Sequence, residues 1–171
     1  MYDLNSQRSW LRSLLVTVCA LLATSVGADQ DPLDLLVGRW DVRVETTRPR
    51  SSVLTYSEVY EWVLDRHFLM GRTLQKSDGT EDIVYGTYDA RADGYPFWIF
   101  SSTGTYTYLA PGKWDARKRR WTWTNPANTD IYYNTQVDFP DDDTRRWSVL
   151  VKDWKGTVIL EQEGVATRRS D

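Results

Sequence analysis

The sequence predicts an all-β protein, folded as a single antiparallel up-and-down β-barrel of about ten strands. Runs of alternating apolar and polar residues recur at short spacing, and turn-forming residues separate them. The chain is also rich in residues that favour pleated surfaces, with 9 Trp, 10 Tyr and 4 Phe. Strands joined by hairpins must hide one apolar face and their edges, and closure into a barrel does both. A β-sandwich is the alternative.

The first 28 residues have the features of a secretory signal peptide. Arg8 and Arg12 precede an apolar run at 14–23, and small residues follow it. This run has about half of the roughly 20 residues that a membrane-spanning helix needs. We therefore expect cleavage after Ala28, a secreted or periplasmic protein with no stable membrane anchor, and one lipocalin-like barrel domain at 29–171.

The composition excludes several classes of protein. The chain has 21 Lys and Arg against 24 Asp and Glu, whereas nucleic-acid binders present strongly basic surfaces. Its one cysteine, Cys19, lies in the predicted signal peptide, so stability must come from packing and not from disulfides. One histidine and no further cysteine exclude the common zinc sites. We expect no metal and no cofactor, and the sequence does not indicate an oligomeric state.

One short helical turn is expected before the first strand. Asp31 is a candidate N-cap, Pro32 suits the first helical position, and an apolar stretch follows at 33–37. We expect this turn to serve as a lid or plug of the barrel.

Ten strands are expected after this turn, separated by turn formers such as Ala92-Asp93-Gly94 and Pro111-Gly112. Their expected ranges are 38–47, 54–64, 67–76, 82–89, 95–102, 105–110, 120–124, 130–139, 145–153 and 157–168.

Residues 56–75 have the plainest alternation and predict a long antiparallel hairpin. A two-residue turn at 65–66 would pair Leu64 with His67. That turn requires a positive φ at Arg66, which is uncommon for arginine. Because side chains alternate along a strand, one face of the hairpin is expected to point into the barrel. This face comprises Leu54, Tyr56, Glu58, Tyr60, Trp62, Leu64, Leu69, Gly71 and Thr73.

Several motifs resemble known barrel families. Gly38-Arg39-Trp40 resembles the Gly-x-Trp signature of lipocalins and the wider calycin group. That resemblance implies that Trp40 closes one barrel end beneath an arginine of the last strand, Arg168 or Arg169. The chain is more similar to the DUF1579 family of uncharacterised bacterial lipocalin-like proteins, which implies a fold but no agreed reaction. The motifs that carry this second resemblance lie at 36–40, 61–69, 86–89 and 112–115.

His67 is the sole histidine of the chain. Nitrobindins, a related barrel family, bind haem through a histidine, so the resemblance raises an axial-ligand role for His67. Its position beside the predicted hairpin turn favours a residue at the barrel rim instead. The acidic run at 141–143 and the basic run at 117–120 are interpreted as solvated turns, with calcium and anionic lipid as their respective alternatives.

Aromatic residues form the candidate ligand-binding site. Binding pockets are rich in aromatic side chains with a few polar groups, although a plain core has the same composition. We expect a small apolar or amphipathic ligand inside the barrel. The candidate residues are Glu58, Tyr60, Trp62, Tyr88, Trp98, Tyr106 and Trp123.

Glu58 is the candidate polar group because an inward-facing carboxylate is costly to bury alone. Arg43 and Arg72 lie on neighbouring strands, although the two-residue turn places Arg72 on the opposite face. Three hypotheses follow. The protein is a binder that orients its ligand through Glu58 or an arginine, a barrel enzyme of isomerase or hydrolase type with Glu58 as general base, or a filled barrel that acts as a surface interaction module.

Overall fold

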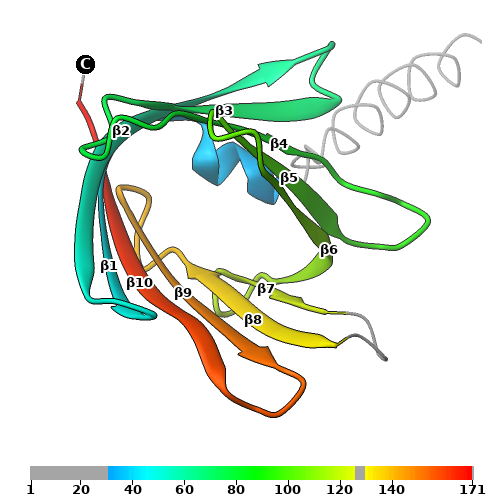
Figure 1. Cartoon of the computed structure of the whole chain (residues 1–171). Helices are drawn as coiled ribbons and strands as arrows, with labels where there is room; N and C mark the ends of the chain where they lie inside the picture. Colours follow the sequence, from blue (N-terminus) through cyan, green and yellow to red (C-terminus); the bar gives the residue numbers. More distant parts are fainter. Residues whose placement is uncertain (1–30, 126–129, 171) are drawn as a thin grey trace, which may run out of the picture. The chain divides into compact units, whose positions relative to one another are not determined.

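The computed structural model describes residues 31–125 and 130–170 (Figure 1). These residues form one closed barrel of ten strands in the order β1-β10-β9-β8-β7-β6-β5-β4-β3-β2, and every neighbouring pair is antiparallel. The predicted all-β, lipocalin-like barrel is confirmed. The predicted signal peptide at 1–28 lies outside the described residues. Within the part that is described, no helix is long and apolar enough to cross a membrane.

The strands follow one another around the barrel, with the 3-10 helix η1 (Pro32–Leu36) before the first. Their bounds are β1 (Gly38–Arg48), β2 (Ser52–Val63), β3 (Phe68–Leu74), β4 (Asp82–Gly86), β5 (Tyr95–Ser101), β6 (Tyr106–Asp115), β7 (Arg120–Thr124), β8 (Ile131–Asp138), β9 (Thr144–Asp153) and β10 (Val158–Arg168).

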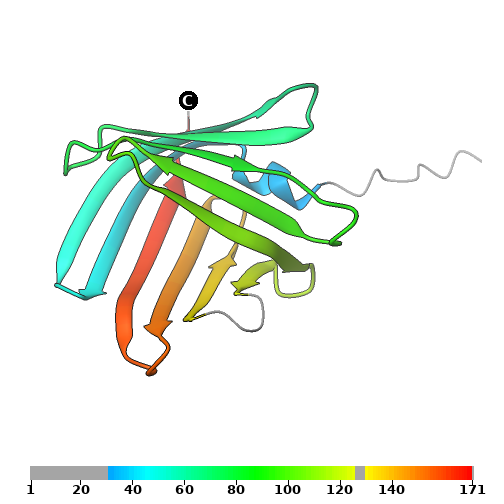
Figure 2. The same ribbon diagram turned by 45° about the vertical axis from the view of Figure 1, so that its right-hand side comes forward.

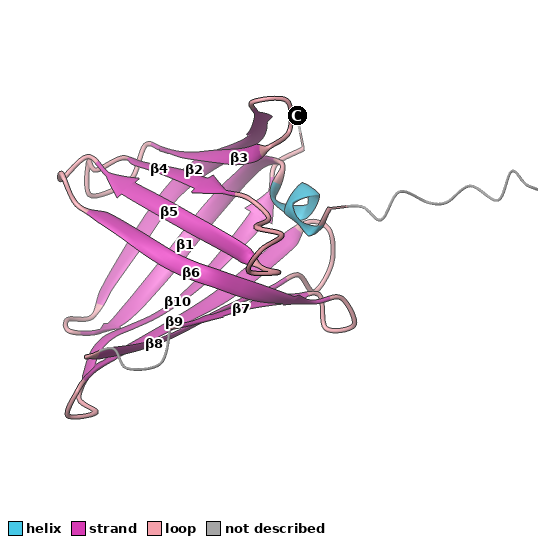
Figure 3. Ribbon diagram, turned by 90° about the vertical axis from the view of Figure 1, so that its right-hand side faces the viewer, coloured by secondary structure: helices cyan, strands magenta, loops and turns pink. Residues whose placement is uncertain are grey.

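Helix η1 forms as the sequence predicts and lies at one end of the barrel (Figure 3). The Asp31 carboxylate accepts a hydrogen bond from the Leu33 amide at 2.9 Å, which satisfies a donor of the first turn. Leu33 and Leu36 are 0% and 4% exposed. The helix therefore adds two apolar side chains to the core at this end.

The β2–β3 hairpin has the predicted register. Val63 pairs with Phe68, and the Leu64 carbonyl accepts a hydrogen bond from the His67 amide at 3.0 Å. Asp65 and Arg66 have φ of 53° and 64°, as a type I′ turn requires. The right-handed twist of the two strands selects this turn even though its second residue is arginine.

The inward face of this hairpin is also as predicted, except at Leu64, which lies beyond the end of β2 in the turn and is 70% exposed. Glu58, Tyr60, Leu69, Gly71 and Thr73 are all buried. The Tyr60 ring lies over Gly71, where a Cβ atom would overlap it, so a glycine is needed at this place.

Strand β6 differs from the prediction. Pro111-Gly112 lies inside the strand and not in a turn, because the register shifts between the pairs Phe97–Leu109 and Tyr95–Gly112. Proline has no amide hydrogen and is tolerated at such a bulge. The chain reverses after Asp115, whose carboxylate accepts hydrogen bonds from two backbone amides of the loop, at 3.0 and 3.2 Å.

The barrel is least tightly closed between β6 and β7. The described residues of these strands pair only over Lys113–Asp115. Towards its other end β6 diverges from β7 and β8 (Figure 2). Thr107 pairs with Ile99, and its side chain is exposed. The hydrogen-bonded contact between β6 and β7 is therefore shorter than the contact between any other two neighbouring strands.

Candidate functional site

The interior is closed at the η1 end by Trp40 and Arg168. Trp40 is 0% exposed, and its indole N–H donates to the Leu36 carbonyl at 2.8 Å. The Arg168 guanidinium lies 4.3 Å from the Trp40 ring centroid and donates to the carbonyls of Leu35, at 3.0 Å, and Val37. Arg169 lies outside, 3.7 Å from an Asp41 carboxylate oxygen.

A buried ion pair lies in the interior above this closure. Arg145 of β9 donates from Nη2 to Oε1 of Glu58 of β2, and the two side chains are 6% and 5% exposed. The partners proposed from the sequence are wrong. Arg43 pairs on the outer face with Glu45 at 2.7 Å, and Arg72, opposite Ile83, is exposed. The inward-facing Glu58 carboxylate pairs with a cation on a strand that is not its neighbour in the barrel. This ion pair compensates the free-energy cost of burying the carboxylate.

Aromatic rings surround the Arg145 guanidinium, whose centre lies 5.3 Å from Trp40, 5.5 Å from Tyr60 and 5.2 Å from Trp147. Each contact is within the range of a cation–π interaction. Burial alone would lower the pKa of Arg145, but the adjacent Glu58 carboxylate outweighs it, and the pKa is raised. Burial, followed by the Glu58 charge, raises the pKa of Tyr60. The guanidinium is therefore held charged and in place.

Interior side chains are less buried towards the mouth, which is the barrel end opposite η1. Inward-facing apolar side chains there are only partly buried, in contrast with Trp40, Trp121 and Trp123 at the closed end. Solvent therefore reaches the inner wall from the mouth. The partly buried residues are Leu54, Ile99, Leu109, Tyr133, Val149, Val151 and Leu160.

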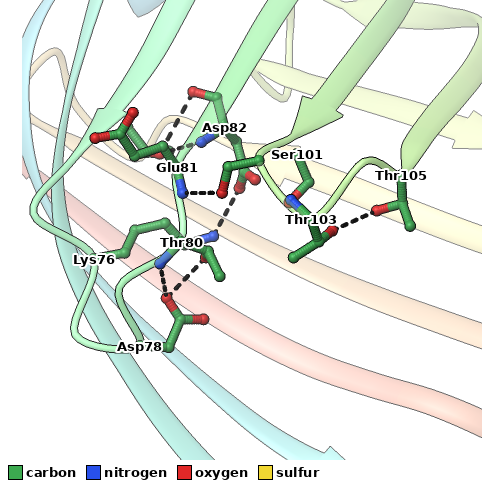
Figure 4. A network of polar contacts seen from close by, with 10 residues as sticks. Lys76, Asp78, Thr80, Glu81, Asp82, Ser101, Thr103 and Thr105 are labelled. Atoms are coloured by element: carbon green, nitrogen blue, oxygen red, sulfur yellow. Dashed lines mark hydrogen bonds and ion pairs between the residues drawn. The ribbon is translucent and has the colours of Figure 1, made fainter.

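One side of the mouth is held by a polar network of the β3–β4 and β5–β6 loops (Figure 4). Lys76 Nζ lies 2.8 Å from Asp82 Oδ2. The Asp78 carboxylate accepts from the amide and hydroxyl of Thr80 at 3.0 and 2.8 Å. A hydrogen bond of 3.0 Å from the Glu81 amide to the Ser102 hydroxyl joins the two loops. This rim is thus fixed by hydrogen bonds without closing the opening.

Two predicted ligand residues lie in the closed half. The Trp62 indole donates to the Asp34 carboxylate at 2.6 Å and packs 4.8 Å from the Arg66 guanidinium, so it ties β2 to η1. Trp123 is 3% exposed and donates to the Tyr95 carbonyl at 2.7 Å. Both indoles are therefore held by contacts within the protein. The inner wall nearest the mouth is formed by other residues.

Trp98, Tyr88 and Tyr106 lie elsewhere than predicted. Phe97 is buried in the interior, so the alternation of β5 turns Trp98 to the outer face, where its ring lies 5.4 Å from that of Tyr108. Tyr106 is 73% exposed on the same outer face. Tyr88 lies beyond the end of β4, is 45% exposed, and donates to the Asp93 carboxylate at 2.7 Å. These three residues do not line the interior.

His67 is exposed beside the hairpin turn, and its carbonyl accepts a hydrogen bond of 2.7 Å from the Thr87 hydroxyl. No group of three or more His, Cys, Asp or Glu side chains within residues 31–125 and 130–170 could hold a metal ion.

Arg145 is the residue of the candidate site that the sequence analysis did not identify. It precedes Trp147, Val149 and Val151 at even spacing, so its inward direction could have been found from alternation. Its contact with Glu58 joins strands that are not neighbours in the barrel, and no local pattern predicts such a contact.

No protein-family model matches the chain, and no curated protein sequence does. Solved structures resemble it in fold. The S-type phycobiliprotein lyase from Guillardia theta is 10% identical, with a TM-score of 0.50 over 81% of this chain and 91% of that one. A DUF3598 protein of unknown function from Nostoc punctiforme is 11% identical, with a TM-score of 0.48 over 80% of this chain and 49% of that one. The chain thus spans about half the length of that protein. A redesigned β-barrel bound to DFHBI is 16% identical, with a TM-score of 0.41 over 78% of this chain and 99% of that one.

These comparisons correct the family assignment. Membership of DUF1579 is wrong, since no family model matches the chain. The likeness to the lyase, at 10% identity, shows the barrel fold alone.

Proposed function

We propose that this chain is a secreted or periplasmic carrier of a small apolar or amphipathic molecule, which it binds inside the barrel. One observation carries the proposal. The inner wall is partly exposed from the mouth as far as a buried polar pair, whereas the opposite end is sealed. Lipocalin-type barrels of such dimensions hold one small ligand, and pockets combine apolar walls with a few placed polar groups.

The chemistry of the two regions suggests the kind of ligand. The partly buried aliphatic side chains near the mouth suit an apolar body. The Glu58–Arg145 pair has no net charge and combines an acceptor with several donors. An uncharged polar end, such as an alcohol or an amide, can donate to Glu58 and accept from Arg145. A carboxylate end would be repelled by Glu58, so the pair favours neutral amphipathic molecules.

The enzyme hypothesis fits this geometry less well. A general base must come within hydrogen-bond reach of the proton that it removes. Taking up that proton would neutralise Glu58 and leave the buried Arg145 guanidinium without its counter-charge, whereas a hydrogen bond from a ligand would not. Undiminished turnover in a Glu58→Gln variant, should any turnover be found, would exclude Glu58 as the base.

Binding of the uncharged fluorescent aromatic probe N-phenyl-1-naphthylamine tests the carrier proposal. Val149→Trp places an indole in the interior, whereas Ser148→Trp places the same indole on the outer face of β9. We expect Val149→Trp to weaken probe binding at least about tenfold, which corresponds to about 1.4 kcal/mol. The Ser148→Trp variant should bind like the wild type. Circular dichroism melting curves check that both variants fold.

Equal probe affinity in the three proteins would contradict binding inside the barrel. Native mass spectrometry of the protein from its own host supplies an independent measurement, since a carried molecule adds mass that is lost on denaturation.

A further inference from the structure

The outer face of β3 to β6 carries a continuous group of large apolar side chains, here called the aromatic face. It is on the opposite side of the barrel wall from the interior site. Its members are Met70, Ile83, Tyr85, Trp98, Phe100, Tyr106 and Tyr108.

Strand register arranges these side chains in two rows. Ile83, Phe100 and Tyr106 are paired across β4, β5 and β6. Met70, Tyr85, Trp98 and Tyr108 are paired across β3 to β6 in the second row. The ring centroids of Tyr85 and Phe100 are 6.5 Å apart, and those of Phe100 and Tyr106 are 6.4 Å apart. The rings therefore pack against one another and form one continuous surface.

The aromatic face is open to solvent. Phe100 and Tyr108 are each 45% exposed, Tyr106 is 73% exposed and Ile83 is 39% exposed. An aromatic side chain has about 150–250 Å² of surface, so these residues expose several hundred Å² together. Contiguous apolar patches of about this size mark interaction sites on soluble proteins.

The composition of the aromatic face is that of a protein interface core. Such cores are enriched in Tyr, Trp, Phe and Met and depleted of charge. No charged residue occurs from Gly94 to Gly112, which includes β5 and the exposed half of β6. Charges of both signs lie at its margin, where Glu61 pairs with Met70 and Arg72 pairs with Ile83.

We propose that the aromatic face binds a second copy of this chain across a two-fold axis. A closed barrel offers no free sheet edge along most of its circumference, so two copies would stack face to face. The uncharged centre avoids repulsion between two chains that each carry a net charge of −3, and the mixed margin lets opposite charges meet. An isologous contact uses the face twice, so it buries the several hundred Å² that these residues expose on each of the two copies.

Sedimentation equilibrium of the purified protein tests this inference. We expect the wild type to dimerise with a Kd in the micromolar range. Phe100→Lys sets two ammonium groups near the axis and should raise the Kd at least about 100-fold, because facing like charges repel strongly. Val165→Lys is the matched control, since Val165 is a 37% exposed apolar residue on the outer face of β10. It should leave the Kd unchanged.

A wild type that stays monomeric at about 100 μM would overturn the inference, as would equal Kd values for the two variants. If Phe100→Lys does not fold, Tyr106→Lys makes the same test at a side chain that is 73% exposed. A monomer that binds neutral phosphatidylcholine vesicles in a Phe100-dependent way would assign the face to lipid instead and equally overturn the inference.

Discussion

The two ends of this barrel are built from the same ten strands but from different side chains. At the η1 end, Trp40 is 0% exposed, and Arg168 covers it while donating to backbone carbonyls. At the mouth, Trp154 is 74% exposed in the β9–β10 turn, and its contact is the Lys155 ammonium at 4.8 Å. The same strands run to both ends of the barrel, but only one end is closed. The comparison therefore teaches that side chains, and not the strands, close a barrel end.

Most of the tryptophan indole N–H groups at the sealed end are hydrogen-bonded. Trp40, Trp62 and Trp123 each donate their indole N–H to an oxygen. Trp121 is the exception, since its buried indole N–H has no partner among the described residues. Stability should therefore be concentrated at this end and tolerance to change at the mouth.

The same substitution at the two ends should have the most unequal effect. Trp40→Ala removes a fully buried ring and should lower the free energy of unfolding by about 5 kcal/mol. Trp154→Ala should change it by less than about 0.5 kcal/mol, because the side chain is mostly exposed. Urea unfolding measures both values. Similar losses in the two variants would break the comparison.

The polar pair between the two regions should show the next largest effect. Arg145→Met leaves Glu58 buried without its cation and should cost about 4 kcal/mol in urea unfolding at neutral pH. The double variant Glu58→Leu/Arg145→Met removes both charges and should recover most of that loss. A double variant as unstable as the single one would show that packing, and not the orphaned carboxylate, causes the loss.

The two neighbouring arginines at the closed end provide a sharper comparison. Arg168→Met removes charged hydrogen bonds to backbone carbonyls and should cost about 2 kcal/mol. Arg169→Met removes an exposed contact with Asp41 and should cost less than about 0.5 kcal/mol. Thermal and urea unfolding of the pair would distinguish them, and equal costs would mean that Arg168 does not close the barrel.

The smallest effect should appear at alkaline pH. Burial and the Glu58 charge raise the pKa of Tyr60 above its ordinary value of 10.0. The unfolded chain therefore releases this proton first, so the associated stability is present below pH 10 and is lost as the pH rises further. The loss should approach about 1.4 kcal/mol per pH unit. In Tyr60→Phe the dependence should be flatter above pH 10, and an unchanged slope would contradict the assignment.

Local pattern was enough to predict much of this molecule. Alternation in β2 and β3 predicted the inward face of Glu58, Tyr60 and Gly71, and the hairpin register follows from the turn between them. Nine strands and the helical turn were placed within three residues of their bounds, whereas β6 continues five residues beyond the predicted range of 105–110. The same reasoning misplaced Trp98, because an aromatic residue was taken to be interior although its neighbour Phe97 has that position.

What the sequence determined by itself is therefore the part that depends on neighbours along the chain: strands, turns and alternation. Tertiary structure alone decided that Glu58 meets Arg145 across the barrel, that Arg168 and not Arg169 covers Trp40, and that one end is open. The physical reason is that side-chain direction is set by local backbone geometry, whereas contacts across a closed sheet depend on how all ten strands curve together.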